Sequence, residues 1–267
     1  MEELRYKNYT MNTLLITEKE NYAIVQMNRG KVNAINLEMV NELKAVFKKS
    51  EEDPAVMGVI LTGQAHYFSA GLDLIEMYQY NEKQIQEFFT AFGGLYLQLV
   101  QFKKPFIAAI TGHSPAGGCV LAVTSDNRYM AEGDAYVIGL NEVAVNIQIS
   151  QNLTEIYAFW LGDGLAHRYI LEGKLLNGKE ALAAGLVDEL LPLDAVLERS
   201  EKQMKHYLKA NQEILLNTKT KLRKHLWDRL DLNPENALKE AAILWWKPEI
   251  RTKMKAYVES FANKNRK

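Results

Sequence analysis

The sequence predicts an α/β fold with parallel strands and a helical C-terminal region. Two patterns lead to this prediction. Up to residue 130, short β-prone runs alternate with apolar stripes at helical spacing, which favours parallel strands with helices packed outside them. From Leu193 onward the apolar spacing is helical throughout. The 267 residues are enough for one large domain, or for one domain with an appendage.

The composition is that of a soluble globular protein, with 48% hydrophobic and 24% charged residues. The 32 basic and 33 acidic side chains leave a net charge of -1, so bulk electrostatics gives no reason to expect a nucleic-acid or membrane partner. The single cysteine, Cys119, excludes an internal disulfide framework and a multi-cysteine zinc site, and it favours a reducing compartment.

The N-terminal segment gives no targeting signal. No apolar run approaches the ~20 residues of a membrane span. Residues 1–21 lack the apolar stretch of a signal peptide and are too acidic for a typical transit peptide. We therefore expect a cytoplasmic protein, with Met11 as an alternative start.

The predicted elements begin with two β-prone runs, residues 14–17 and 22–27, whose charged connection predicts a hairpin. Asn36 precedes an apolar stripe that starts at Leu37, so we expect it to cap a helix that ends at Asp53-Pro54. The further expected elements are a strand at 56–61, a helix at 85–99, strands at 106–110 and 135–138, helical segments with turns over 152–184, a strand at 186–191 and helices from 193.

The change to purely helical structure divides the chain near residue 205. We expect residues 1–205 to form the core and residues 206–267 to form a helical C-terminal region. About 60 residues are too few for a large separate core, so this region is expected to pack on the body or on another subunit and to serve oligomerisation.

Three segments interrupt the regular pattern, and the first covers residues 66–74. The small residues Ser69, Ala70 and Gly71 let the backbone approach a ligand closely and leave N–H groups available as donors. The alternative is an ordinary loop with a glycine turn.

The second segment, residues 111–120, follows a predicted strand. Ser114 and Pro115 form a suitable N-cap and first-turn pair for a helix that begins with Ala116 and two glycines. The unpaired N–H groups at such a helix start suit a developing negative charge. Alternatively, the Gly-Gly pair permits tight helix packing.

The third segment, residues 139–143, carries Glu142 between Leu140 and Val143. Desolvation in such apolar surroundings raises the pKa of a carboxyl group, which makes the group a useful proton shuttle. The alternative is a solvated loop glutamate.

Other chemistries find less support. The chain has no Walker-type loop, no dinucleotide-binding glycine pattern and no Gly-x-Ser-x-Gly elbow, and its five histidines lack metal-ligand spacing. The basic residues Lys219, Lys221, Arg223 and Lys224 alternate with apolar ones such as Leu222. This pattern predicts a solvated amphipathic helix, with a minor role in phosphate binding as the alternative.

Taken together and in order, these segments resemble the crotonase (enoyl-CoA hydratase/isomerase) superfamily. Residues 32–36, Val-Asn-Ala-Ile-Asn, are similar to its Asn-Ala-Leu-Asn stretch, residues 68–73 to its Phe-Ser-Ala-Gly-x-Asp motif, and residues 115–119 to its second oxyanion segment. The resemblance extends over residues 20–192. It implies a spiral of ββα units with a helical C-terminal region that builds a homotrimer, sometimes paired into a homohexamer.

Residues 68–74, 115–119 and 138–142 look most like the mitochondrial-type 3,2-enoyl-CoA isomerase branch. In that branch a single glutamate transfers the proton, and it corresponds to Glu142. Hydratases of the superfamily carry a second glutamate after the Gly-Gly-Cys of the oxyanion segment, where this chain has Val120. One carboxylate can take an α proton and return it to the γ carbon, whereas hydration is usually described with two.

The resemblance also implies the remaining site residues. The oxyanion hole corresponds to the backbone N–H groups of Leu72 and Gly117, which would stabilise the thioester oxygen of a dienolate. The CoA thioester is the substrate, and neither a cofactor nor a metal ion is implied. The substrate-binding positions are Ala70, Gly71, Asp73 and Leu74 along the CoA channel, and Asn141 beside the acyl thioester.

Three functions remain open. The first is an enoyl-CoA isomerase of unsaturated fatty acid β-oxidation. The second is another acyl-CoA reaction on the same scaffold, such as hydration or thioester hydrolysis, because a fold does not fix a function. The third is a non-catalytic CoA-ester binder. Tyr136, Ile147, Phe159 and Trp160 are candidates for the acyl pocket, with core packing as the alternative.

Overall fold

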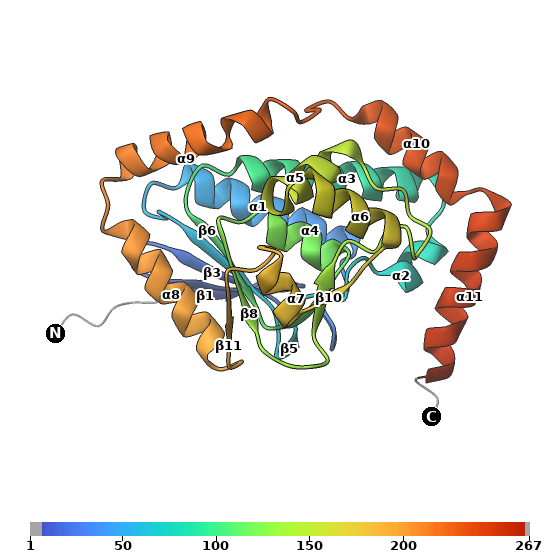
Figure 1. The fold of residues 1–267 in the computed structure, drawn as a ribbon, viewed down its shortest axis with the longest axis horizontal. Helices are drawn as coiled ribbons and strands as arrows, with labels where there is room; N and C mark the ends of the chain where they lie inside the picture. Colours follow the sequence, from blue (N-terminus) through green and yellow to red (C-terminus); the bar gives the residue numbers. More distant parts are fainter. Residues whose placement is uncertain (1–6, 265–267) are drawn as a thin grey trace.

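The structure, a computed structural model, describes residues 7–264, in which two β-sheets pack against helices (Figure 1). Residues 1–6, on which part of the expected cytoplasmic location depends, lie outside the described residues. The strands are β1 (Lys7–Thr10), β2 (Leu14–Glu18), β3 (Ala23–Met27), β4 (Val59–Thr62), β5 (His66–Tyr67), β6 (Phe106–Ile110), β7 (Gly112–Pro115), β8 (Asn127–Ala131), β9 (Val137–Gly139), β10 (Leu176–Asn177) and β11 (Glu189–Leu191).

The larger sheet has the strand order β1-β2-β3-β4-β6-β8-β11, and the smaller sheet has the order β10-β9-β7-β5. β2 and β3 form the predicted antiparallel hairpin, with Leu14 opposite Met27. From β3 to β11 every neighbouring pair in the larger sheet is parallel. The predicted α/β fold class with parallel strands is therefore confirmed.

The helices cover both faces of the larger sheet. Helix α1 begins as predicted, because the Asn36 side chain accepts the Met39 N–H at 3.0 Å. Apolar residues of β4 and β6 are buried on both faces, as parallel strands between helices require. The helices are α1 (Leu37–Glu52), α2 (Leu74–Gln79), α3 (Glu82–Gln101), α4 (Gly117–Val123), α5 (Gln151–Leu161), α6 (Asp163–Glu172), α7 (Gly178–Ala183), α8 (Ala195–Leu208), α9 (Gln212–Trp227), α10 (Glu235–Trp245) and α11 (Pro248–Lys264).

The predicted N-cap at Ser114 is wrong. Ser114 lies in β7 opposite Ile138 of β9, and its buried hydroxyl has no hydrogen-bond partner in the described part of the chain. Helix α4 starts at Gly117, with Ala116 at the N-cap position and no side-chain cap. The reason is that strand pairing, which is not visible in the local sequence, outweighs the capping preference of Ser-Pro.

The C-terminal helices continue from the body without a separate core. Residue 205 lies inside α8, which covers one face of the larger sheet through Val196 and Met204. Leu226 of α9 and Trp245 of α10 belong to the apolar cluster that lies on the other face of the larger sheet. In Figure 1, α9 and α10 run across the outer side of the helical layer. Every helix within residues 7–264 is too short or too polar to cross a membrane.

Candidate active site

Three neighbouring strands of the smaller sheet bring the three interrupting segments together. β7 pairs in parallel with β5 on one side and with β9 on the other. Each strand leads at its carboxyl end into one segment: residues 68–74 after β5, residues 116–118 after β7 and residues 140–142 after β9. The carboxyl ends of parallel strands share one edge of a sheet, so segments distant in the sequence meet there.

Two backbone N–H groups lie side by side at this edge. The Leu72 N–H donates to no other residue of the described chain. In the bridge between Leu72 and Ile35, the Ile35 N–H donates to the Gly71 carbonyl and the Asp73 N–H donates to the Ile35 carbonyl, so the Leu72 N–H is not used. Gly117 is the first residue of α4, so its N–H has no partner inside the helix. A Cβ placed on Gly117 would lie only 3.3 Å from the Leu72 nitrogen. Together the two donors can bind a negatively charged oxygen.

Unusual backbone conformations position these donors. Gly71 has φ +89°, and a Cβ there would lie 3.1 Å from the Ala116 Cβ, so both conformation and space favour glycine. Ala116 has φ 45° and ψ -119°, and such a conformation costs an L-residue about 1–3 kcal/mol. The Ala116 N–H donates to the Gly139 carbonyl at 2.8 Å, which ties the turn to the end of β9. No pattern in the sequence predicted this strain.

Glu142 starts a single helical turn that is closed by two hydrogen bonds. Asn146 N–H donates to the Val143 carbonyl at 3.2 Å, and Ile147 N–H donates to the Glu142 carbonyl at 2.9 Å. Asn146 has φ 62°, a left-handed conformation that asparagine adopts more readily than most residues. This arrangement is a Schellman motif, and it fixes the backbone that carries the Glu142 side chain.

The Glu142 side chain is buried, and one of its two carboxyl oxygens has no partner among the described residues. The residue is 7% exposed, and its Oε2 atom has no hydrogen-bond partner in residues 7–264. Burial raises the pKa of this carboxyl group from its ordinary 4.5 to about 7, and its own backbone N–H lowers it only in part. The predicted rise of this pKa is therefore present. A carboxyl group with such a pKa gives and takes protons near neutral pH.

The surroundings of Glu142 supply no compensating charge. Cys119 of α4 and Tyr157 of α5 are fully buried. Burial raises the pKa of both groups, and the nearby Glu142 carboxylate raises them further, so both stay protonated at neutral pH. Val120 is also fully buried in α4. The described residues contain no group of three or more potential metal ligands.

A cavity of about 210 Å³ lies beside Glu142 and Leu72. Glu142 is the only carboxylate among the described residues that line it. The sequence analysis did not predict that α3 and α10 form walls of this cavity. The available signal was a glycine inside an apolar helix, since such a glycine often has a packing or functional reason. These two helices contribute Phe89, Phe92, Gly93, Tyr96, Ala237, Leu238 and Ala241.

The other predicted substrate-binding residues lie near the site without lining this cavity, namely Ala70, Gly71, Asp73, Leu74 and Asn141. The Asp73 carboxylate accepts a first-turn N–H of α2 at 2.9 Å and pairs with Arg29 at 2.7 Å. Leu74 is 8% exposed and belongs to the core. The buried Asn141 Oδ1 has no hydrogen-bond partner in the described chain, so it is free to accept from a ligand. The substrate-binding roles of all five stay predictions.

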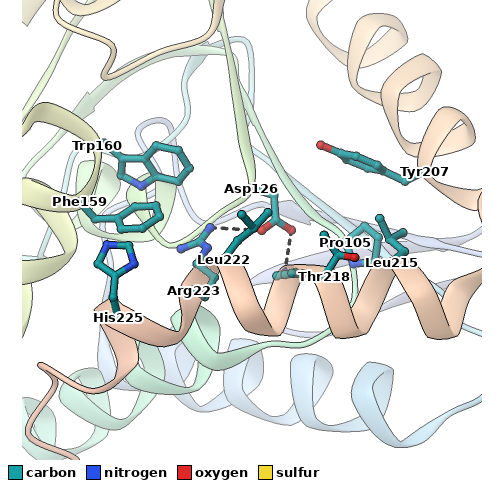
Figure 2. A pocket seen from close by; sticks show the side chains of 11 residues that line it. Pro105, Asp126, Phe159, Trp160, Tyr207, Leu215, Thr218, Leu222, Arg223 and His225 are labelled. Carbon is teal, nitrogen blue, oxygen red and sulfur yellow. Dashed lines mark hydrogen bonds and ion pairs between the residues drawn. The ribbon is translucent and has the colours of Figure 1, made fainter.

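The four candidates for the acyl pocket fall into separate places. Ile147 lines the cavity beside Glu142. Tyr136 instead contacts His66 through its hydroxyl group. Phe159 and Trp160 line a second cavity of about 490 Å³, which lies between α5, α8 and α9 (Figure 2). Only Ile147 is therefore positioned to contact a ligand beside Glu142.

Two of the four residues of the basic stretch, Lys219 and Arg223, also line the second cavity. Lys219 Nζ lies 2.7 Å and Arg223 Nη2 lies 3.2 Å from the Asp126 carboxylate, whose ion pair with Arg223 is visible in Figure 2. The two basic side chains are 12% and 4% exposed. The prediction of a solvated helix is wrong for them, because α9 turns this face toward the body. Lys221 and Lys224 are exposed as predicted.

Comparison with known proteins identifies the family. Residues 17–265 match the model of the family described as Enoyl-CoA hydratase/isomerase. The chain belongs to this family. The superfamily predicted from the three motifs is thereby confirmed, and the matched region includes the C-terminal helices, which carry none of those motifs.

The relatives of the chain include proteins named as isomerases and proteins named as hydratases. The chain is 34% identical to Enoyl-CoA delta isomerase 1, mitochondrial, of Rattus norvegicus over 95% of its own length and 89% of that protein. It is 29% identical to 2,3-dehydroadipyl-CoA hydratase of Escherichia coli (strain K12), over 70% of this chain and 72% of the relative. The crystal structure of human mitochondrial delta3-delta2-enoyl-CoA isomerase matches with a TM-score of 0.89 at 29% identity, covering 95% of this chain and 99% of that one.

Proposed function

We propose that this family member is an enoyl-CoA isomerase that moves the β,γ double bond of an unsaturated fatty acyl-CoA to the α,β position. One observation carries the proposal: a single carboxylate, Glu142, lines the described part of the cavity next to the two free amides. A proton shuttle between two carbons needs one group that is first base and then acid. Similarity to enoyl-CoA isomerases over nearly the whole chain supports the same choice.

In the proposed reaction, the ionised Glu142 takes a proton from the α carbon of the acyl thioester. The C–H bonding electrons enter the conjugated system, and the negative charge collects on the thioester oxygen of a dienolate. The N–H groups of Leu72 and Gly117 stabilise this oxygen, and one such donor is typically worth ~3–4 kcal/mol of barrier. The protonated Glu142 then returns the proton to the γ carbon, which restores the carboxylate.

The buried position of Glu142 suits this cycle. With a pKa of about 7, both protonation states are accessible near neutral pH. Because Oε2 has no hydrogen-bond partner in the described residues, it is free to face the substrate. Neither step requires a cofactor or a metal ion, so we propose that the enzyme uses none.

An absorbance assay with a trans-3-enoyl-CoA tests the proposal, because the conjugated 2-enoyl thioester product absorbs in the ultraviolet. We expect turnover by the wild type and a loss of about 10³-fold or more in Glu142→Gln. Glu172→Gln, at an exposed glutamate, is the matched control and should retain full turnover. Near-normal activity of Glu142→Gln would refute the role of Glu142.

Hydration is the second candidate, since the chain is 29% identical to 2,3-dehydroadipyl-CoA hydratase over 70% of its length. A parallel assay with a 2-enoyl-CoA distinguishes the two reactions. Loss of conjugated absorbance without any isomerisation would favour a hydratase. If neither ester reacts but CoA esters bind, a thioesterase or a non-catalytic binder replaces the proposal.

Assembly and location form the remaining parts of the proposal. We propose a homotrimer or homohexamer built through residues 206–267, for which the exposed apolar side chains of Ile214, Leu222 and Ile243 offer contact surface. Light scattering after gel filtration measures this assembly. A role in fatty acid β-oxidation follows from the proposed substrate. The cytoplasmic location stays a prediction, while the isomerase of Rattus norvegicus is named as mitochondrial.

A further inference from the structure

One wall of the cavity beside Glu142 comes from the C-terminal helix α10, which packs across α3. Gly93 of α3 and Leu238 of α10 meet there, and both line the cavity. A Cβ placed on Gly93 would lie 3.1 Å from one Leu238 methyl group and 3.2 Å from the other. These separations are tighter than ordinary van der Waals contact, so the branched end of Leu238 occupies the space that a side chain at position 93 would need.

Leu238 is the only large side chain that α10 contributes to this wall in the described structure. The other α10 residues that line the cavity, Ala237 and Ala241, end at their Cβ atoms. The facing residues of α3 include the rigid rings Phe89 and Phe92. A substitution at position 238 therefore changes the size of the cavity more directly than any other change in α10.

We infer that Leu238, seated on Gly93, limits the length of the acyl chain that the cavity accepts. This inference rests on the proposed acyl-CoA substrate, and it assigns a specificity role to a helix of the C-terminal region. The part of a ligand that fits this wall is an apolar acyl tail, because α3 and α10 contribute mainly aliphatic and aromatic surface. The chemistry at Glu142 does not depend on it.

Leu238→Ala tests the inference by enlarging the cavity. The kcat/KM of the purified enzyme is measured for 3-hexenoyl-, 3-decenoyl- and 3-hexadecenoyl-CoA. We expect the ratio of the longest to the shortest substrate to rise by about tenfold, since one methylene in an apolar pocket typically changes specificity at least tenfold. Leu182→Ala is the matched control, because Leu182 is the same residue type, is 43% exposed and does not line this cavity.

Gly93→Ala tests the same contact from the opposite side. The new methyl group adds volume at a position that lines the cavity and crowds Leu238, so the ratio should fall, while alanine favours the helix over glycine and protects folding. In the double variant the methyl group added at position 93 takes part of the space that Leu238 leaves. We therefore expect its ratio to return toward the wild-type value, as coupled neighbours do.

A binding measurement separates this inference from the proposed reaction. Saturated acyl-CoAs of the same lengths are titrated calorimetrically into each variant, which requires no turnover. If the wild type isomerises no ester but Leu238→Ala shifts the binding preference to longer chains, the reaction is wrong and the role of Leu238 stands. If the wild type is active but Leu238→Ala behaves like Leu182→Ala, the reaction stands and the role of Leu238 is refuted.

Discussion

Glu142 and Asp126 are both carboxylates beside a cavity, but only Asp126 has partners on other residues of the described chain. Asp126 pairs with Lys219 and Arg223 and accepts the Phe106 N–H at 2.8 Å. Glu142 has a pKa of about 7, and its Oε2 atom binds no other described residue. The two sites show the two ways in which a folded chain holds a buried acid.

The difference separates a structural charge from a reactive one. The cluster around Asp126 joins α9 to the loop before β8, since Arg223 also donates to the Ser125 carbonyl at 2.7 Å. Asp126 is ion-paired with both cations, so the cluster can hold the C-terminal region on the body. An unmatched charge such as Glu142 destabilises the fold, and proteins retain such groups mainly where they act on a ligand. Each of the two carboxylates can be replaced by its isosteric amide, so the effect of removing its charge can be measured.

The largest expected change in stability comes from Asp126→Asn. The substitution leaves two buried cations without a carboxylate, which should lower the free energy of unfolding by about 3–5 kcal/mol. Urea denaturation followed by circular dichroism measures this loss. Turnover per folded molecule should not change, because Asp126 lies in the other cavity. A variant that keeps wild-type stability but loses turnover would show that Asp126 is a reactive carboxylate and not a structural one.

Glu142→Gln should change stability in the opposite direction, and only at higher pH. The folded-state pKa of Glu142 lies above its ordinary value of 4.5, so between pH 4.5 and about 7 the folded state binds more protons than the unfolded state. Wild-type stability therefore falls as pH rises through this interval, by about 3 kcal/mol in total. Glutamine does not titrate, so the variant escapes this loss.

The difference between the two proteins is the quantity to measure. Relative to the wild type, Glu142→Gln should gain stability between pH 5 and pH 8, as determined by urea denaturation at both values. Other titrating groups cancel in this difference because both proteins contain them. Parallel pH profiles would mean that Glu142 does not carry the raised pKa.

The sequence predicted elements whose causes are local. The β2–β3 hairpin and the capped start of α1 depend on residues within a few positions of one another, and both predictions are confirmed. The three interrupting segments and Glu142 were singled out through motifs of a family that the comparison confirms, and their roles stay predictions. Ser114 was misassigned because its position depends on pairing with β9, which the local pattern does not contain.

Long-range partners explain the other failures. The burial of Lys219 follows from Asp126, a partner 93 residues earlier in the chain, so a count of basic residues could only suggest a solvated face. The cavity wall from Leu238 has the same origin, because nothing near position 238 indicates that Gly93 faces it. Cavities and ion clusters are made by elements that meet in space, and periodicity in one segment does not identify the other.

The smallest predicted effect concerns Ala116, whose strain belongs to the candidate site and not to the Asp126 cluster. At φ 45° and ψ -119°, glycine relieves a cost of about 1–3 kcal/mol but adds flexibility that costs about 0.5–1 kcal/mol. Ala116→Gly should therefore raise the free energy of unfolding by up to about 2.5 kcal/mol, measured by urea denaturation. Turnover should fall severalfold, because the Gly117 N–H that follows is held less firmly toward the thioester oxygen. A variant that is less stable than the wild type would show that Ala116 is not strained, and the contrast with the ion-paired Asp126 would then depend on Glu142 alone.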